Sequence, residues 1–79
     1  MFYVYILESQ SVPNTFYTGY TTDLKQRLSQ HNSGQSLHTR KFIPWKLKNY
    51  VAFTDEHKAR AFEEYLKTHS GRIFCKKHF

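Results

Sequence analysis

Residues 16–31 constrain the fold more than any other stretch, because a strand pattern gives way there to a helix pattern. Residues 16–20 are aromatic or β-branched apart from Gly19, and such residues favour a pleated strand. A glycine inside a strand often marks a point where another group approaches the backbone closely. Thr21 or Thr22 then offers a hydroxyl N-cap. The stretch therefore predicts a strand that leads directly into a helix.

The predicted helix carries two residues that are unusual for an inner face. Leu24 and Leu28 lie one turn apart and form its apolar stripe. Arg27 and His31 are also one turn apart, and both fall on or beside that stripe. Because a buried cation or imidazole is costly without a partner, we expect a polar group or a ligand beside these two side chains.

The rest of the chain predicts a single α+β domain over residues 1–79. Residues 2–7 are apolar on both faces, which indicates a central strand, and Pro13-Asn14 indicates a turn before the next strand. Asn32-Ser33-Gly34 predicts the end of the first helix, with Gly34 as its left-handed cap, and residues 35–44 are expected to form a surface loop. The third strand is expected to start at Pro44 and to alternate apolar and polar residues through Phe53, with Asn49 as the one polar residue in the apolar phase. The later elements are a helix from Thr54 to about Thr68, a break at Ser70-Gly71, and a short basic helix over residues 72–79.

This order of elements is strand, strand, helix, strand, helix, helix. It predicts a three-stranded, mainly antiparallel sheet that is flanked by helices.

The charge balance limits the partners. Twelve Lys and Arg residues face six Asp and Glu residues, which gives a formal net charge of +6 at pH 7. A small basic domain points to nucleic acid or an anionic membrane surface, although such charge also serves solubility alone. No basic amphipathic helix stands apart from the predicted core helices, and no apolar run reaches the length of a membrane span, so we expect no membrane partner. The single cysteine, Cys75, excludes an internal disulfide and fits a reducing cytoplasm.

Glu63 is the most informative residue in the second half of the chain. It falls within the apolar stripe that Ala59 and Leu66 define, whereas Glu64 points outward. A buried, unpaired carboxylate is very costly, so we expect a cation beside Glu63. The pattern alone leaves three alternatives open: a salt bridge to Arg27, a carboxylate that bends out to solvent, or a metal ligand.

Two tyrosines of the predicted hairpin are expected to meet. Alternation places Tyr5 and Tyr17 near the middle of two paired strands, and a hairpin can bring them together on one face. Each tyrosine alone is more simply a core residue whose hydroxyl finds a polar partner.

Taken together, these residues resemble the GIY-YIG nuclease family, and most closely its small stand-alone bacterial members, the excinuclease-like endonucleases. The resemblance rests on Val4-Tyr5-Ile6, Tyr17-Thr18-Gly19, Arg27, His31 and Glu63. It continues through Pro44-Trp45-Lys46-Leu47 and the run from Ser70 to Phe79, and so covers almost the whole chain.

The resemblance implies a metal-dependent phosphodiesterase that acts on DNA, with a link to DNA repair. It implies that Glu63 holds one divalent cation, Mg²⁺ or Mn²⁺, and that Tyr17 or Tyr5 orients or deprotonates the attacking water. It further implies that Arg27 stabilises charge on the scissile phosphate and that His31 assists proton transfer or phosphate binding. These residue types suit the chemistry, because a hard cation prefers oxygen ligands and a guanidinium matches a phosphate in charge and geometry.

Two departures from the family pattern leave room for slow or lost catalysis. Tyr20 stands where excision-repair members often carry a lysine, which removes a cation that could activate the base. Many catalytic members also have an asparagine well beyond the glutamate, but that region here gives Cys75, and no asparagine follows Asn49.

The sequence therefore predicts an endonuclease that hydrolyses DNA phosphodiesters with one metal ion. The alternatives are a non-catalytic DNA- or RNA-binding module on the same fold, and an interaction module whose charge only solubilises it. The endonuclease and the non-catalytic binding module both predict the same phosphate contacts. These would come from Lys25, Arg40, Lys41, Lys46, Lys48, Arg72, Lys76 and Lys77.

Overall fold

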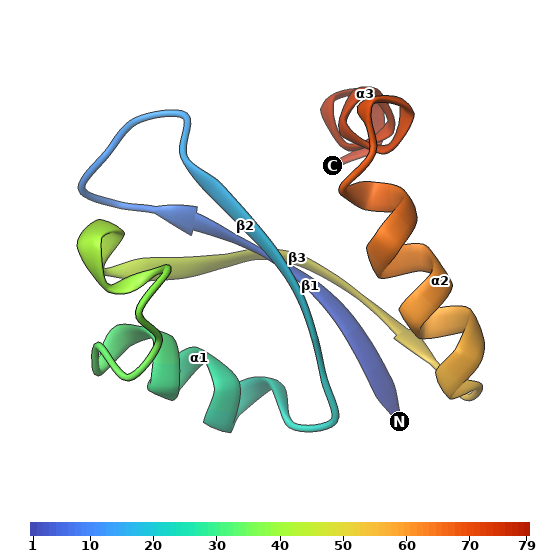
Figure 1. Ribbon diagram of the computed structural model, residues 1–79, viewed down its shortest axis with the longest axis horizontal. Helices are drawn as coiled ribbons and strands as arrows, with labels where there is room; N and C mark the ends of the chain where they lie inside the picture. The colour runs from blue at the N-terminus through green and yellow to red at the C-terminus, as the bar shows by residue number, and fades with distance from the viewer.

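The structure is a computed structural model that describes residues 1–79. Its elements are β1 (Phe2–Ser9), β2 (Phe16–Thr21), α1 (Leu24–Asn32), the 3₁₀ turn η1 (Arg40–Phe42), β3 (Trp45–Phe53), α2 (Glu56–Leu66) and α3 (His69–His78). The strands form one antiparallel sheet in the order β2-β1-β3. Figure 1 shows α1 on one side of this sheet and α2 with α3 on the other. The predicted α+β architecture is confirmed.

β1 lies in the middle of the sheet and carries core residues on both faces, as its continuous apolar run predicts. Val4 and Ile6 pack on one face against Ala59 and Leu66 of α2. The opposite face holds a second cluster, which consists of Tyr5, Leu7 and Trp45 with Leu24 and Leu28 of α1 packed against it. The functional side chains predicted on β1 and α1 therefore share one face of the sheet.

β3 changes the face of its apolar side chains at a β-bulge, which the sequence pattern did not reveal. The register pairs Leu7 with Leu47, but it pairs the preceding residue of β1 with Asn49, so Lys48 is the extra residue. Leu47 thus packs in the cluster on the α1 side, whereas Phe53 packs in the cluster on the α2 side. The bulge explains why Asn49 interrupts the expected alternation of β3.

The N-cap of α1 is Asp23, so the expectation of a threonine cap is wrong. The carboxylate of Asp23 accepts the backbone N–H of Gln26 at 3.0 Å, because an ionised carboxylate is a strong acceptor for a free N–H of the first turn. Thr21 lies before the cap, and its hydroxyl accepts the backbone N–H of Asp23 at 3.1 Å. Beyond the other end of α1, Gly34 has a φ of +82°, the left-handed conformation that was expected there.

The boundary between α2 and α3 also differs from the predicted one. α2 ends at Leu66, and Thr68 caps α3 by accepting the backbone N–H of Gly71 at 3.1 Å. Ser70-Gly71 therefore lies in the first turn of α3 rather than in a break. A glycine is required there, because a Cβ on Gly71 would overlap the backbone of Tyr65.

Candidate active site

Tyr5 occupies a space that only a glycine leaves open. Gly19 of β2 lies opposite Tyr5 in the strand register, and a Cβ on Gly19 would overlap the ring and hydroxyl of Tyr5. The ring of Tyr5 therefore leans across the β2 backbone. The ring of Tyr17 lies 6.3 Å from it, centroid to centroid, so the two tyrosines meet on one face as predicted.

The hydroxyl of Tyr5 lies between the two unusual residues of α1. It is 3.0 Å from Nε2 of His31, and it accepts a hydrogen bond from Nε of Arg27 at 3.3 Å. Arg27 also donates from Nη1 to the side-chain oxygen of Gln30 at 3.0 Å. His31 is fully buried, with an exposed fraction of 0%, and Tyr5 is 2% exposed. The polar partners that were expected beside Arg27 and His31 are therefore present.

Thr39 completes this cluster, and sequence reasoning missed it. Its hydroxyl oxygen lies 2.7 Å from Nδ1 of His31, and its carbonyl accepts the indole N–H of Trp45 at 2.9 Å. Thr39 is 1% exposed, although residues 35–44 were expected to form a surface loop. The loop has no hydrophobic period, so no sequence signal distinguishes its one buried hydroxyl.

The environment keeps Tyr5 and His31 neutral beside a cation. Burial raises the pKa of Tyr5, against the opposing effect of Arg27. Burial and then the charge of Arg27 lower the pKa of His31. Burial lowers the pKa of Arg27, but the hydroxyls of Tyr5 and Tyr17 outweigh it and the net shift is upward. At neutral pH the site therefore contains a phenol, a neutral imidazole and a guanidinium in contact.

Glu63 comes from α2 and does not make the salt bridge to Arg27 that was one of the expected alternatives. Its carboxylate pairs instead with Nζ of Lys67 at 3.0 Å, one helical turn away. Arg27 is hydrogen-bonded to Tyr5 and Gln30 instead. The Glu63 side chain is 19% exposed, so it is partly buried at the packed surface of α2. Its negative charge contributes to the raised pKa of Tyr5, which links the carboxylate electrostatically to the cluster.

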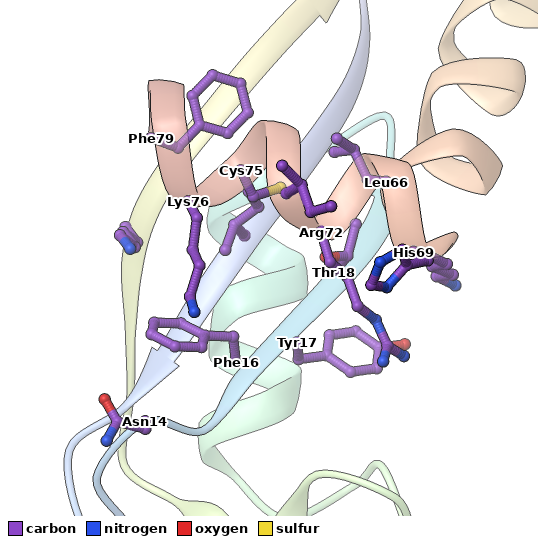
Figure 2. A pocket seen from close by; sticks show the side chains of 14 residues that line it. Asn14, Phe16, Tyr17, Thr18, Leu66, His69, Arg72, Cys75, Lys76 and Phe79 are labelled. Atoms are coloured by element: carbon purple, nitrogen blue, oxygen red, sulfur yellow. The ribbon is translucent and has the colours of Figure 1, made fainter.

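An open groove of about 1050 Å³ runs between β2 and α3. Figure 2 shows Arg72 extending from α3 toward Tyr17, and Lys76 extending toward Phe16. The cationic side chains that line the groove are Lys48, Lys67, Arg72 and Lys76, and no carboxylate lines it. The groove touches the candidate site at two points, because Tyr17 belongs to its lining and Lys67 is the partner of Glu63.

The predicted basic residues are only partly gathered. Lys48, Arg72 and Lys76 line the groove, while the others are exposed elsewhere: Lys25, Arg40, Lys41, Lys46 and Lys77. Lys67 was missed as a groove residue, although its spacing of one turn from Glu63 indicates an ion pair on the helix. None of the helices has the length and apolar character to cross a membrane.

A divalent cation would find one strong protein ligand at this site. No cluster of three or more His, Cys, Asp or Glu side chains is positioned to hold a metal ion. The carboxylate of Glu63 is a hard oxygen donor at the edge of a packed surface, with only Lys67 as its polar partner. A single carboxylate suits Mg²⁺, which keeps several waters and is commonly completed by substrate phosphates. The residues therefore fit a weakly held Mg²⁺ or Mn²⁺ ion.

Comparison with known proteins shows the family to which the chain belongs. Residues 1–77 match the family model described as the GIY-YIG catalytic domain. A UPF0213 protein of Streptococcus pyogenes serotype M3 is 42% identical over 71 residues, which cover 89% of this chain and 75% of that protein. The UPF0213 protein in the ldhD 5′ region of Pediococcus acidilactici is 43% identical over 74 residues, which cover 90% of this chain and 74% of that protein. The chain therefore belongs to the GIY-YIG nuclease superfamily.

Proposed function

We propose that the protein is a metal-dependent endonuclease that hydrolyses phosphodiester bonds in DNA in the cytoplasm. The observation that carries this proposal is that a hydrogen-bonded cluster and the cationic groove meet at Tyr17. The cluster of Tyr5, Arg27 and His31 lies beside Tyr17, and Tyr17 also lines the cationic groove. A nuclease needs such a junction, because it must hold a polyanion while polar groups act on one phosphate.

The groove is the proposed binding surface for the phosphate backbone. Its cations come from three different elements, namely Lys48 on β3, Lys67 beyond the end of α2, and Arg72 with Lys76 on α3. They are exposed, and no acidic side chain competes with them in the lining. Phosphate contacts of this kind give affinity without sequence preference and depend steeply on salt.

The proposed chemistry divides between accessible and buried groups. Tyr17 is half-buried and faces the groove, so its hydroxyl is the one that would contact and orient the attacking water. Arg27 is held by Tyr5 and Gln30 and would balance the charge that builds up on the phosphate. His31, neutral at the operating pH, would serve proton transfer through Tyr5. A divalent cation bound by Glu63 would polarise the phosphate oxygens.

A non-catalytic nucleic-acid-binding module is the second candidate. The ion pair between Glu63 and Lys67 favours it, because this pair neutralises the carboxylate that a metal ion needs. Tyr20 favours it as well, since its hydroxyl donates to Glu56 and it leaves no lysine at that position. Such a module would retain the cationic groove and bind DNA without cleaving it.

Glu63 and Glu64 form a matched pair that separates these two candidates. The experiment incubates the wild type, Glu63→Gln and Glu64→Gln with labelled duplex, nicked, branched and single-stranded DNA in Mg²⁺, Mn²⁺ or EDTA. We expect metal-dependent cleavage by the wild type, and a loss on the order of 100-fold or more in Glu63→Gln, since the amide lacks the charge that a hard cation needs. Glu64→Gln changes an exposed carboxylate and should cleave almost as well as the wild type.

DNA affinity and stability complete the experiment. Glu63→Gln should bind DNA at least as well as the wild type, because it removes a negative charge near the groove. Its stability should fall by only about 0.3–0.5 kcal/mol, the size of an exposed ion pair on a helix. Equal cleavage by the two variants would refute the metal-ligand role of Glu63. DNA binding without cleavage on any substrate would leave the non-catalytic module as the function.

A further inference from the structure

Thr39 lies at the end of a chain of hydrogen bonds that starts at Arg27. The chain links Nε of Arg27 to the hydroxyl of Tyr5 at 3.3 Å, that hydroxyl to Nε2 of His31 at 3.0 Å, and Nδ1 of His31 to the hydroxyl of Thr39 at 2.7 Å. Three of its four members are nearly or fully buried, so water cannot substitute for a missing partner. The direction of each bond is therefore set within the chain.

The direction follows from the donors and acceptors. Arg27 can only donate, so the Tyr5 oxygen accepts its Nε–H. Burial raises the pKa of Tyr5, so the phenol keeps its proton and needs an acceptor. The only acceptor in contact with the hydroxyl is Nε2 of His31. His31 must then be a neutral imidazole with its proton on Nδ1, which donates to the hydroxyl of Thr39.

We propose that Thr39 is a positioning residue that holds His31 in the Nδ1–H tautomer and so directs the Tyr5 hydroxyl oxygen toward Arg27. Its role is therefore indirect, because Thr39 does not contact the groove. The carbonyl of Thr39 accepts the indole N–H of Trp45 at 2.9 Å, which fixes the residue from its other side. This inference rests on the proposed function only for its effect on cleavage.

The groups around His31 support a single protonation state. Tyr5 faces it from β1, the ring of Tyr17 lies 5.0 Å away from β2, and Arg27 lies one turn before it on α1. No carboxylate contacts the ring to favour an imidazolium. An imidazolium would donate from both nitrogens, and the Tyr5 hydroxyl would then meet two donors and lose the acceptor for its own proton.

Two substitutions of Thr39 separate its hydroxyl from its shape. Thr39→Val keeps the volume and removes the acceptor, so the histidine proton should move to Nε2 and point at Tyr5. Thr39→Ser keeps the hydroxyl and removes one methyl group. If the hydroxyl is what matters, the serine variant should behave as the wild type does.

The test is ¹⁵N NMR of histidine-labelled protein without DNA or metal, since the ring nitrogen shifts of His31 distinguish the two tautomers. We expect the Nδ1–H tautomer in the wild type and in Thr39→Ser, and the Nε2–H tautomer in Thr39→Val. An Nε2–H tautomer in the wild type would overturn the proposal without any variant. An unchanged Nδ1–H tautomer in Thr39→Val would overturn the role of Thr39.

Cleavage is the second readout, and its failure is distinguishable. Thr39→Val should cleave DNA about tenfold more slowly than the wild type, the effect expected if the Tyr5 hydroxyl loses its hydrogen bond from the charged Arg27. Thr39→Ser should restore the rate. If the wild type cleaves no DNA, the proposed function fails, while the NMR result still decides the tautomer.

Discussion

Gly19 offers the sharpest test of how the fold builds the candidate site, because the substitution Gly19→Ala adds one methyl group at a known place. That methyl group would overlap the hydroxyl oxygen and Cζ of Tyr5 and lie 2.9 Å from Cε1. The Tyr5 ring is not a flexible end that can move aside. It is 2% exposed, and its hydroxyl is bonded to His31 and Arg27.

The magnitude follows from these contacts. Overpacking a dense core costs about 1–3 kcal/mol, and the displaced hydroxyl of Tyr5 loses one or both buried hydrogen bonds at about 1 kcal/mol each. Alanine also restricts the unfolded chain, which offsets about 0.4–1 kcal/mol. The net loss in the free energy of unfolding should be about 2–3 kcal/mol. In a domain of this size, that lowers Tm by roughly 10 °C or more.

Gly34→Ala is the matched control, because it also adds a methyl group to a glycine but at a position where that group has space. Gly34 has a φ of +82°, and a Cβ there would meet only Cβ of Arg40 at 3.9 Å. Its cost is therefore conformational, about 1–2 kcal/mol, and leaves Tyr5 in place. Urea unfolding followed by circular dichroism gives both stabilities, and DNA cleavage is then compared at a temperature where both variants are folded.

The two variants should lose cleavage for different reasons. Gly19→Ala should lose cleavage beyond what its unfolded fraction explains, since the Tyr5 hydroxyl can no longer hold Arg27. Gly34→Ala should cleave in proportion to its folded fraction. If Gly19→Ala were as stable as the wild type, the close packing of Tyr5 on β2 would be refuted, and so would the role of Gly19 in building the site.

Three further measurements examine the core, the groove and the buried histidine. Leu66→Ala removes a fully buried side chain between α2 and β1 and should lower the free energy of unfolding by about 2–5 kcal/mol in urea titrations. Arg72→Ala and Lys76→Ala should each weaken DNA binding at unchanged Tm and reduce the slope of log K against log salt by about 0.9, measured by fluorescence anisotropy. The pKa of His31 lies below its ordinary value of 6.5, so the unfolded chain binds a proton more readily below that pH, and stability should fall as the pH drops from about 6.5. His31→Gln should lack that part of the pH dependence in Tm measured across the same range.

The parts of the site that depend on periodicity could be predicted from the sequence. The two-residue period of a strand placed Tyr5 and Tyr17 on one face, and their rings lie 6.3 Å apart. The helical period placed Arg27 and His31 on an inner edge, where both bond to Tyr5. The periodicity of a strand or a helix fixes the direction in which each side chain points, so it also indicates which side chains can meet.

The parts that depend on tertiary partners could not be predicted. Thr39 comes from a loop without period, and only the position of His31 makes its hydroxyl useful. The bulge at Lys48 changes the face of β3, and a single polar residue in the apolar phase, Asn49, does not by itself indicate a bulge. For Glu63 the sequence offers two cations, the distant Arg27 that we expected and the local Lys67 that the structure shows. A spacing of one turn needs no tertiary contact, which is why the local pair forms.

The candidate site and the hydrophobic core share residues, and this limits how any loss of activity can be interpreted. Tyr5 belongs to the cluster on the α1 side, and His31 is completely buried beside it. Substituting either residue therefore changes packing as well as chemistry, and a loss of cleavage is informative only with a measured free energy of unfolding. Arg72 is exposed, and Glu63 is a partly buried member of an ion pair on a helix, so substitutions of these two residues are expected to cost less stability. A loss of cleavage in a Glu63 variant, or of DNA binding in an Arg72 variant, reports directly on metal or phosphate contacts. Variants of these two residues can therefore test the function, and variants of Tyr5 and His31 can then test the mechanism.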